Sequence, residues 1–501
     1  MKMVKSLLLG SAAGLAAVSG TQAADLPVKA KPVEYVKICS LYGEGFYYIP
    51  GTDICLKVGG YVRADYGWNV TGARTVHYTG APGAQDRSVS PYSTRHRAHF
   101  NFDSRTQTAY GTLRTYVAVH VDNQDQGTVT VNPTRAFIQW AGFTFGHTKS
   151  FTDVPGTPGD DTFKSLFQTQ NQSDTGANGT NQIAYTWELG NGMTLNFGAD
   201  ERRTKGLGNL SLNVTTAGSN PTTAFGPYQH PTPWVNFAVN QAWGRFGVSA
   251  IFNKVNAQYY GADAGVLGYT PSASCTAQPG TANCGYPDDK WGWAVLSGID
   301  IKAPWAGPGD HFGGYFNYGV GASAYAGGSN LNSPGLFGAS NTIAFGVISD
   351  GVFVNGGQFE LTTAWTAGAG WEHFWLPNFS TAAYGTYTQV SYSDSVINSR
   401  LFCGGANGTT AANQNFRVAS GVTCDPGFTY WTVGAVTNWY PVAGFRLAVD
   451  VQYTRIETAM DGQQVTLGKA QGLRPTGVYT AKDQGILAVV FRAQRSFATG
   501  D

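Results

Sequence analysis

The sequence predicts an all-β protein, a 16-stranded antiparallel transmembrane β-barrel with short periplasmic turns and long outer loops. Apolar and polar side chains alternate along many segments, as they do in strands with two different faces. Short turns alternate along the chain with long loops that are rich in Gly, Asn, Ser and Pro. Trp and Tyr residues cluster near the ends of the alternating segments. These features are typical of barrels in the bacterial outer membrane.

The composition excludes several other classes of protein. The 501 residues include 66 Gly and 13% aromatic side chains, which argues against a disordered chain. The 32 Lys and Arg residues are balanced by 31 Asp and Glu residues, so we expect no nucleic-acid partner. Beyond the extreme N-terminus, no run approaches the roughly 18 apolar residues that a membrane-spanning helix needs.

Residues 1–23 have the features of a secretory signal peptide. Lys2 and Lys5 precede a short apolar stretch, residues 7–18, and Ala23 is a small residue suited to cleavage. A retained membrane anchor is the alternative, which the shortness of the apolar stretch disfavours.

Export favours disulfide bonds, and the six Cys residues fall into three local pairs. These candidates are Cys39 with Cys55, Cys275 with Cys284, and Cys403 with Cys424. Proximity in the sequence is the only ground for this pairing. The absence of a zinc-like Cys and His spacing predicts no metal site and no cofactor.

Residues 24–55 are predicted to form an N-terminal periplasmic segment ahead of the first strand. The segment leaves no room for a plug domain, which disfavours a gated transporter. The sequence leaves open whether it is a tether pinned by Cys39 and Cys55 or part of a contact between subunits.

The clearest alternation lies in residues 182–200, where two strands flank a tight turn at residues 190–192. The apolar face of the first strand carries Ile183, Tyr185, Trp187 and Leu189. Its polar face carries Gln182, Thr186 and Glu188. Because lipid cannot satisfy polar side chains, the polar face of each strand must line the lumen.

Sixteen segments can be read in this way, and closed single-chain barrels of the bacterial outer membrane have an even number of strands. They span residues 56–68, 94–105, 109–122, 132–140, 143–150, 181–189, 193–203, 232–241, 245–256, 291–302, 311–325, 358–372, 379–392, 428–439, 445–456 and 482–497. A β-sandwich would also alternate, but the connections and the aromatic strand ends favour the barrel. The barrel therefore occupies residues 56–497, and residues 498–501 form a C-terminal extension.

Three stretches resemble the trimeric outer-membrane porins of alphaproteobacteria, the family typical of rhizobia. They are residues 33–63 with their Cys pair, residues 134–153, and residues 494–497 at the end of the last strand. The resemblance implies a homotrimer of 16-stranded barrels in the outer-membrane lipid. It also implies passive diffusion of small hydrophilic solutes and ions, and a third outer loop folded into the lumen.

By this resemblance, residues 151–180 are the loop that narrows the pore. The loop carries Asp153, Asp160 and Asp161, which we expect to form its acidic side. Facing it we expect a basic wall, because Arg63, Arg95, Arg97 and Arg114 lie on the polar face of neighbouring early strands, together with His99. Arg135 joins this wall if its strand keeps strict alternation.

Other functions remain as alternatives. A substrate-specific barrel, for example for oligosaccharides, would be favoured by aromatic tracks in the lumen. A secreted β-rich binding protein would need no detergent for extraction. An outer-membrane enzyme is disfavoured, because none of the 8 His residues lies beside an obvious Ser nucleophile motif. His96 and His99 are three residues apart, so a strand points them to opposite faces and they cannot share a metal.

Overall fold

The computed structural model describes most of the chain between residues 37 and 497. The described residues are 37–78, 90–159, 162–168, 175–176, 178–209, 222–223, 225–256, 288–328, 330–338, 341–353, 359–403, 417–419, 421–467 and 474–497. The predicted signal peptide (residues 1–23), the extension (residues 498–501), Asp160, Asp161, Cys275 and Cys284 lie outside them.

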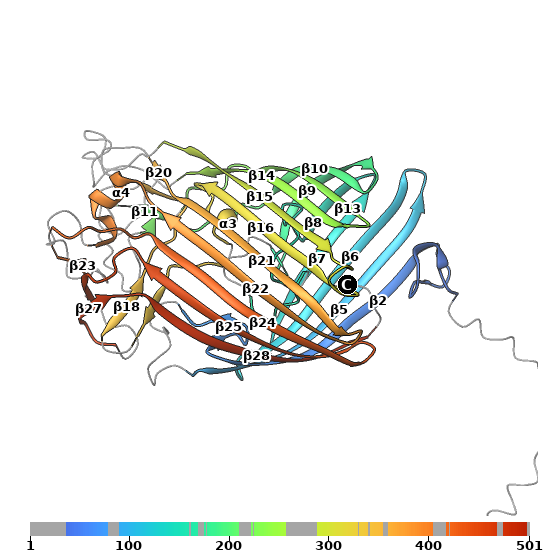
Figure 1. Cartoon of the computed structure of the whole chain (residues 1–501). Helices are drawn as coiled ribbons and strands as arrows, with labels where there is room; N and C mark the ends of the chain where they lie inside the picture. The colour runs from blue at the N-terminus through green and yellow to red at the C-terminus, as the bar shows by residue number, and fades with distance from the viewer. Residues whose placement is uncertain are drawn as a thin grey trace, which may run out of the picture.

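Sixteen antiparallel strands close into a tilted barrel (Figure 1). They are β2 (Cys55–Trp68), β5 (Tyr92–Thr108), β6 (Gly111–Gln124), β7 (Thr130–Trp140), β8 (Phe143–Thr148), β9 (Thr180–Gly190), β10 (Met193–Asp200), β13 (Thr232–Gln241), β14 (Gly244–Val255), β15 (Lys290–Lys302), β16 (His311–Val320), β21 (Thr363–Leu376), β22 (Phe379–Ser391), β24 (Phe428–Val442), β25 (Phe445–Thr458) and β28 (Gln484–Phe497). Each strand pairs with its sequence neighbours, and β28 closes the ring on β2. The predicted fold class and strand number are confirmed.

Some predicted boundaries are wrong where a strand passes into a loop. The strand predicted at residues 311–325 ends at Val320, and a short helix, α3 (Ser323–Ala326), follows inside the barrel. The strand predicted at residues 193–203 ends at Asp200. Alternation cannot detect such ends, because loop residues packed inside the barrel are also partly apolar.

The two ends of the barrel differ as predicted. One end carries turns at residues 109–110, 141–142, 191–192, 242–243, 377–378 and 443–444 and a longer connection at residues 303–310. Asn191 and Gly192 both have positive φ values, of 51° and 70°, which suits a two-residue hairpin turn. The opposite end carries the long loops (Figure 1).

Inward and outward side chains differ in polarity along each strand. In β5 the inward Arg97 is 7% exposed, whereas the outward Phe100 is 41% exposed and faces the lipid side. Exposed Trp side chains recur on the outer surface, as in Trp68, Trp187 and Trp291. Polar side chains therefore line the interior and apolar ones cover the outside.

The outer loops build small sheets of their own. One contains β17 (Gly335–Phe337), β18 (Thr342–Phe345), β27 (Gly477–Ala481), β26 (Gln464–Leu467) and β23 (Arg417–Val418). Another contains β12 (Thr222–Thr223), β11 (Leu207–Asn209), β19 (Gly351–Phe353) and β20 (Phe359–Leu361), and a third pairs β3 (Val70–Thr71) with β4 (Thr75–Val76). The loops also contain α4 (Asp394–Ser399) and η2 (Leu401–Cys403). None of the helices in the described ranges is long and apolar enough to cross a membrane.

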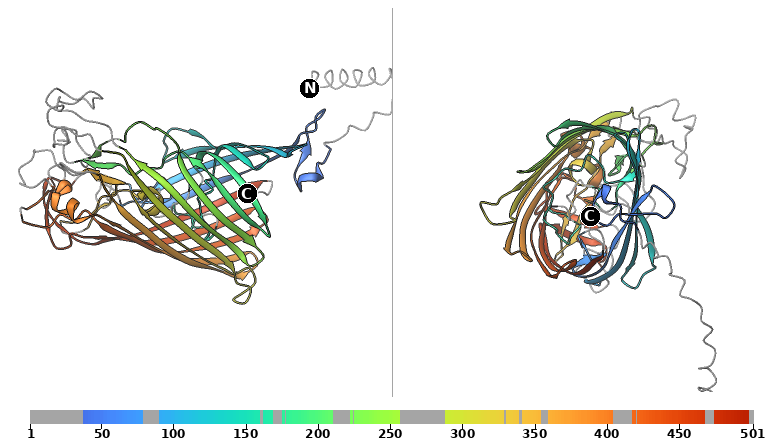
Figure 2. Two further views of the ribbon diagram at one scale, coloured as in Figure 1. Left: turned by 90° about the horizontal axis from the view of Figure 1, so that it is seen from above. Right: turned by 90° about the vertical axis from the view of Figure 1, so that its right-hand side faces the viewer.

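Loops fill part of the barrel interior, as the view along the barrel shows (Figure 2). The third loop, residues 149–179, places Phe163, Leu166 and Phe167 in one apolar cluster with Tyr78 of the first loop and Tyr430 of the wall. A third loop inside the lumen was predicted. The first loop and the sixth loop, residues 321–362, also contribute to this cluster, which was not predicted.

The start of the described chain forms a small hairpin beyond the barrel rim (Figure 2, left). It contains η1 (Ser40–Tyr42) and β1 (Tyr47–Tyr48), and β1 pairs with the first residues of β2. A disulfide joins Cys39 to Cys55, and Phe46 packs beside it. This hairpin makes residues 37–55 a folded extension of the first strand.

Replacing Cys39 and Cys55 by serine should release the hairpin and leave the barrel intact. The disulfide closes a loop of 16 residues, a length for which about 3 kcal/mol is typical. Limited proteolysis should then cut between residues 37 and 54, while the heat-modifiable mobility of the barrel on gels stays unchanged. Loss of the folded barrel in this variant would contradict the interpretation.

Candidate functional site: the channel constriction

A cavity of about 1120 Å³ lies between the third loop and the wall made by the first strands of the barrel. Its lining comes from β2, β5, β6 and β7 on one side and from residues of the third loop on the other. Arg74 of the first loop reaches it near the outer end, and Tyr440, Gly444 and Ser496 reach it near the short turns. The cavity therefore extends along the barrel axis.

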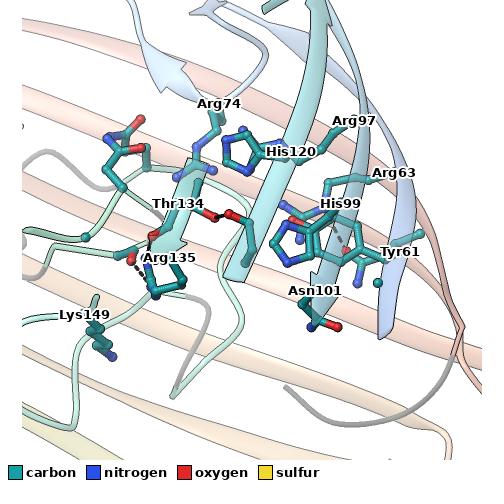
Figure 3. A pocket seen from close by; sticks show the side chains of 18 of the residues that line it. Tyr61, Arg63, Arg74, Arg97, His99, Asn101, His120, Thr134, Arg135 and Lys149 are labelled. Carbon is teal, nitrogen blue, oxygen red and sulfur yellow. Dashed lines mark hydrogen bonds between the residues drawn. The ribbon is translucent and has the colours of Figure 1, made fainter. Parts of the chain in front are cut away.

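The wall of the cavity carries a cross-strand row of basic side chains. Arg446 on β25 lies opposite Gln494 on β28, which lies opposite Arg63 on β2. Arg63 lies opposite Arg97 on β5, and its Nε donates to Gln494 Oε1 at 2.8 Å. Figure 3 shows Arg63 and Arg97 on adjacent strands. Strict alternation puts this row on the inner face.

Arg95 belongs to a second, more deeply buried group. Asp65, which is fully buried, accepts hydrogen bonds from Arg95 on β5 and from Arg492 Nε on β28 at 2.7 Å. The group joins β2 to both of its neighbours, and one of these contacts spans the seam where the barrel closes. Two guanidiniums around one carboxylate leave a local excess of positive charge.

Arg97 and His99 have partners within the wall. Arg97 forms a two-pronged ion pair with Asp122 on β6, with distances of 2.6 and 2.8 Å. The ring of His99 stacks on Tyr61 at 4.8 Å. These contacts hold both side chains against the wall, and Figure 3 shows His99 beside Tyr61.

Arg135 reaches the cavity although its strand does not keep strict alternation. The register of β6 and β7 shifts between Ala118 and Val119, so Thr134 is an extra residue beside Arg135. Arg135 donates to the carbonyl of Gly176 in the third loop at 2.7 Å. The bulge therefore lets both residues line the cavity.

Arg114 lies on the inner face as predicted, but it is not among the residues that line the cavity. It shares the carboxylate of Asp103 with Arg105, at 2.9 and 2.7 Å, close to the short turn that joins β5 and β6. Alternation gives the side of the strand on which a residue lies, but not its depth in the barrel.

Charges are unequal on the inner faces of five adjacent strands. Eight basic side chains lie at inward positions of β25, β28, β2, β5 and β6: Lys57, Arg63, Arg95, Arg97, Arg105, Arg114, Arg446 and Arg492. Four carboxylates share these faces: Asp65, Asp103, Asp122 and Asp450.

The third loop packs along the opposite wall before it turns toward the cavity. Phe151 stacks on Trp234, and Val154 packs into the cluster with Ile251. Phe163 then stacks on His311, whose ring bonds Asp300 at 2.9 Å and Glu372 at 2.8 Å. The loop thus covers acidic side chains of that wall.

The tip of the loop is fixed to β25 by a buried carboxylate. Asp450 accepts hydrogen bonds from the Ser165 hydroxyl at 2.7 Å and from the Leu166 backbone N–H at 2.8 Å. The Tyr384 hydroxyl donates to its other oxygen at 2.9 Å. Gln168 N–H donates to the carbonyl of Arg74 at 2.9 Å, which links the third loop to the first.

The acidic side chain of the loop that the structure describes has an internal role. Asp153 accepts hydrogen bonds from the backbone and hydroxyl of Thr175, at 2.9 and 2.7 Å, and is not among the lining residues. The predicted Asp160 and Asp161 lie outside the described residues. Lys149 and Lys164 are the charged loop residues among the described lining residues.

Sequence reasoning missed five basic residues of the cavity. They are Arg74, Lys149, Lys164, Arg203 and Arg446. Alternation already placed Arg446 on a polar face. It could not show that β25 lies next to β28, which pairs with β2, so that Arg446 comes close to Arg63. The other four lie in loops, where no periodic signal exists.

The outer mouth contains a second disulfide and a fully buried carboxylate, Asp350. Cys403 is bonded to Cys424, as the local pairing predicted. Asp350 accepts backbone hydrogen bonds from Lys205 and Ser323, both at 2.8 Å. Burial raises the pKa of Asp350 to about 6, and burial also lowers the pKa of Lys205 to about 8. Both groups are thus ionised together only near neutral pH.

Replacing Gly156 by alanine should loosen the third loop. Its φ is +85°, and an added Cβ would lie 2.3 Å from the carbonyl oxygens of both Gly314 and Ile299. We expect a cost of about 1–3 kcal/mol and a single-channel current with added fluctuations. Gly462, with φ +79° and open space around it, is the control, and Gly462→Ala should leave the current steady. Equal noise in both variants would contradict this reading.

Comparisons with known proteins agree with the fold. A family profile described as porin subfamily matches residues 25–490. The putative outer membrane protein y4fJ of Sinorhizobium fredii is 36% identical over 192 residues, which cover 37% of this chain and 51% of y4fJ. The chain thus spans about half the length of this relative.

A longer match and a solved structure complete the comparison. Porin Omp2a of Brucella abortus is 31% identical over 308 residues, 60% of this chain and 79% of Omp2a. The outer membrane channel DcaP of Acinetobacter baumannii shares the fold, with a TM-score of 0.52 and 15% identity over 90% of this chain and 99% of DcaP. With a closed barrel and a family profile that spans most of its length, the chain belongs to the porin family and is a channel of the bacterial outer membrane.

Proposed function

We propose that the protein is a general diffusion porin that works as a homotrimer. In this proposal each barrel passes small hydrophilic solutes and ions without catalysis. The observation that carries the proposal is the polar cavity of about 1120 Å³ between the third loop and the wall. A 16-stranded barrel has a wide lumen, so the inserted loop sets its size limit.

The constriction in this proposal has two sides. Arg63, Arg95, Arg97 and Arg135 supply the wall, and the third loop supplies the other side. Charged groups on a fixed wall select solutes by size and charge, because a solute must exchange part of its water for contacts with them. Arg114 contributes positive charge to the electrostatic field of the lumen nearer the short turns.

A short stretch of wall supports the trimer. Strand β8 has 6 residues, about 20 Å at the usual rise, whereas a membrane-spanning strand needs about 9–11 residues. The outward Phe143 and Phe145 of this strand are 44% and 41% exposed and stack on each other. A neighbouring barrel would cover this low apolar wall better than lipid does.

Single-channel recording of the detergent-purified protein in a planar bilayer tests the proposal. We expect stepwise openings in groups of three, with a steady ohmic current, and a trimer on gels that dissociates only on heating. Liposome swelling should show that uncharged sugars enter at rates that fall smoothly with size. Folded protein without conductance, or swelling with one sugar alone, would overturn the proposal.

A further inference from the structure

We infer that the channel is selective for anions, and that its constriction binds small oxyanions carrying two or more negative charges. This inference rests on the proposed function, because selectivity requires an open water-filled pore. It concerns the sign and spacing of the charges on the two sides of the constriction.

The cavity surface is strongly biased toward positive charge. Its described lining contains seven Arg and two Lys side chains and no carboxylate. The carboxylates beside the wall arginines lie behind them: Asp65 is fully buried, and Asp122 is 12% exposed and held by Arg97. A cleft lined by one sign of charge raises the local concentration of the opposite ion.

The described residues of the third loop add to this bias. The loop presents Lys149 and Lys164 to the cavity, while it covers the acidic Glu372, which is fully buried. Lys164 Nζ lies 3.4 Å from Glu372 Oε1. Three further carboxylates of the loop, Asp160, Asp161 and Asp174, lie outside the described residues.

The spacing of the guanidiniums suits an anion with two charged groups. Arg63 and Arg97 lie directly opposite each other on adjacent strands, about 5 Å apart at the backbone. Arg446 lies two strands from Arg63, about 10 Å away, on the same register line. A guanidinium N–H donates a strong, charge-assisted hydrogen bond to a carboxylate or phosphate oxygen. A small dicarboxylate can therefore contact two of these side chains at once.

Reversal potentials measured under a KCl gradient across a planar bilayer test the selectivity. We expect a chloride-to-potassium permeability ratio of about 3 or more. Succinate added to one side should lower the chloride current, while acetate at the same ionic strength should not. A permeability ratio at or below one, or equal effects of succinate and acetate, would overturn the inference.

Matched variants locate the effect. Arg63→Gln combined with Arg446→Gln should bring the permeability ratio toward one and weaken the succinate effect at least about tenfold, since two charged contacts are lost. Arg495→Gln, at an exposed outward position of β28, should change neither. Lys149→Gln with Lys164→Gln tests the loop side of the constriction without changing the barrel wall.

If both double variants conduct with wild-type selectivity, the inference is refuted while the proposed function stands. Folded wild-type protein that does not conduct would overturn the proposed function and this inference with it.

Discussion

Asp65→Asn is expected to lower the stability of the barrel by about 3–5 kcal/mol, the range measured when one partner of a buried ion pair is removed. The carboxylate is fully buried and binds both Arg95 and Arg492. An amide keeps the shape but removes the charge that offsets two buried guanidiniums. Because these contacts join β2 to β5 and β28, the closing seam should open first. Urea unfolding in detergent and the temperature at which the folded gel band is lost measure the effect.

Asp103→Asn is the matched control. Asp103 also binds two arginines, Arg105 and Arg114, but both of these are 27% exposed. Water and ions screen this group, so we expect a change of about 1 kcal/mol or less. Similar losses in the two variants would show that burial at the seam does not determine the effect.

Much of the fold could be predicted from the sequence because a barrel strand faces two different solvents. In β5, alternation separates the inward Arg95 and Arg97 from the outward Phe100 and Phe102. Because each strand repeats this signal, the number of strands was predicted correctly, and the errors are confined to the positions of the strand ends. The inward side of the predicted basic wall followed from the same rule.

Depth and partnership could not be predicted in this way. Arg63 and Arg114 share an inward orientation, yet Arg63 lines the cavity and Arg114 lies toward the short turns. Arg492 reaches Asp65 only because the last strand closes on the first, a contact between residues that are far apart in the sequence. Register between distant strands, rather than alternation, determines these contacts.

The charged side of the third loop was the least predictable part of the site. A loop carboxylate can face the pore, water or its own backbone, and residue type does not distinguish these. Asp153 binds Thr175 within the loop, while Lys164 points to the cavity and approaches Glu372. The loop also rests on residues of the first and sixth loops, whose place in the lumen has no sequence signature.

Asp450→Ala should have the largest effect on the current through the channel. The side chain of Asp450 holds the tip of the third loop through Ser165 and Leu166, inside a site closed to water. Without it, a buried N–H and a buried hydroxyl lose their shared acceptor, which costs about 1–3 kcal/mol for each group. The tip should then leave the wall for part of the time. We expect single-channel recordings to show frequent transitions between the normal conductance and other levels.

Thr454→Ala is the control, because Thr454 lies on the inner face of the same strand, is fully buried, and accepts a hydrogen bond from Gln452 Nε2 of its own strand at 3.1 Å. Its channel should conduct as steadily as the wild type. Asp450→Asn keeps one oxygen acceptor and nearly the same shape. An intermediate frequency of transitions in this variant would show that the carboxylate, and not only the packing of the side chain, holds the loop. A steady wild-type current in Asp450→Ala would mean that the other links of the tip hold the loop. These are the apolar contacts of Phe163, Leu166 and Phe167, the hydrogen bond from Arg446 to the carbonyl of Lys164, and the Lys164–Glu372 ion pair. The comparison therefore measures how much of the hold on the tip of the third loop comes from the Asp450 carboxylate.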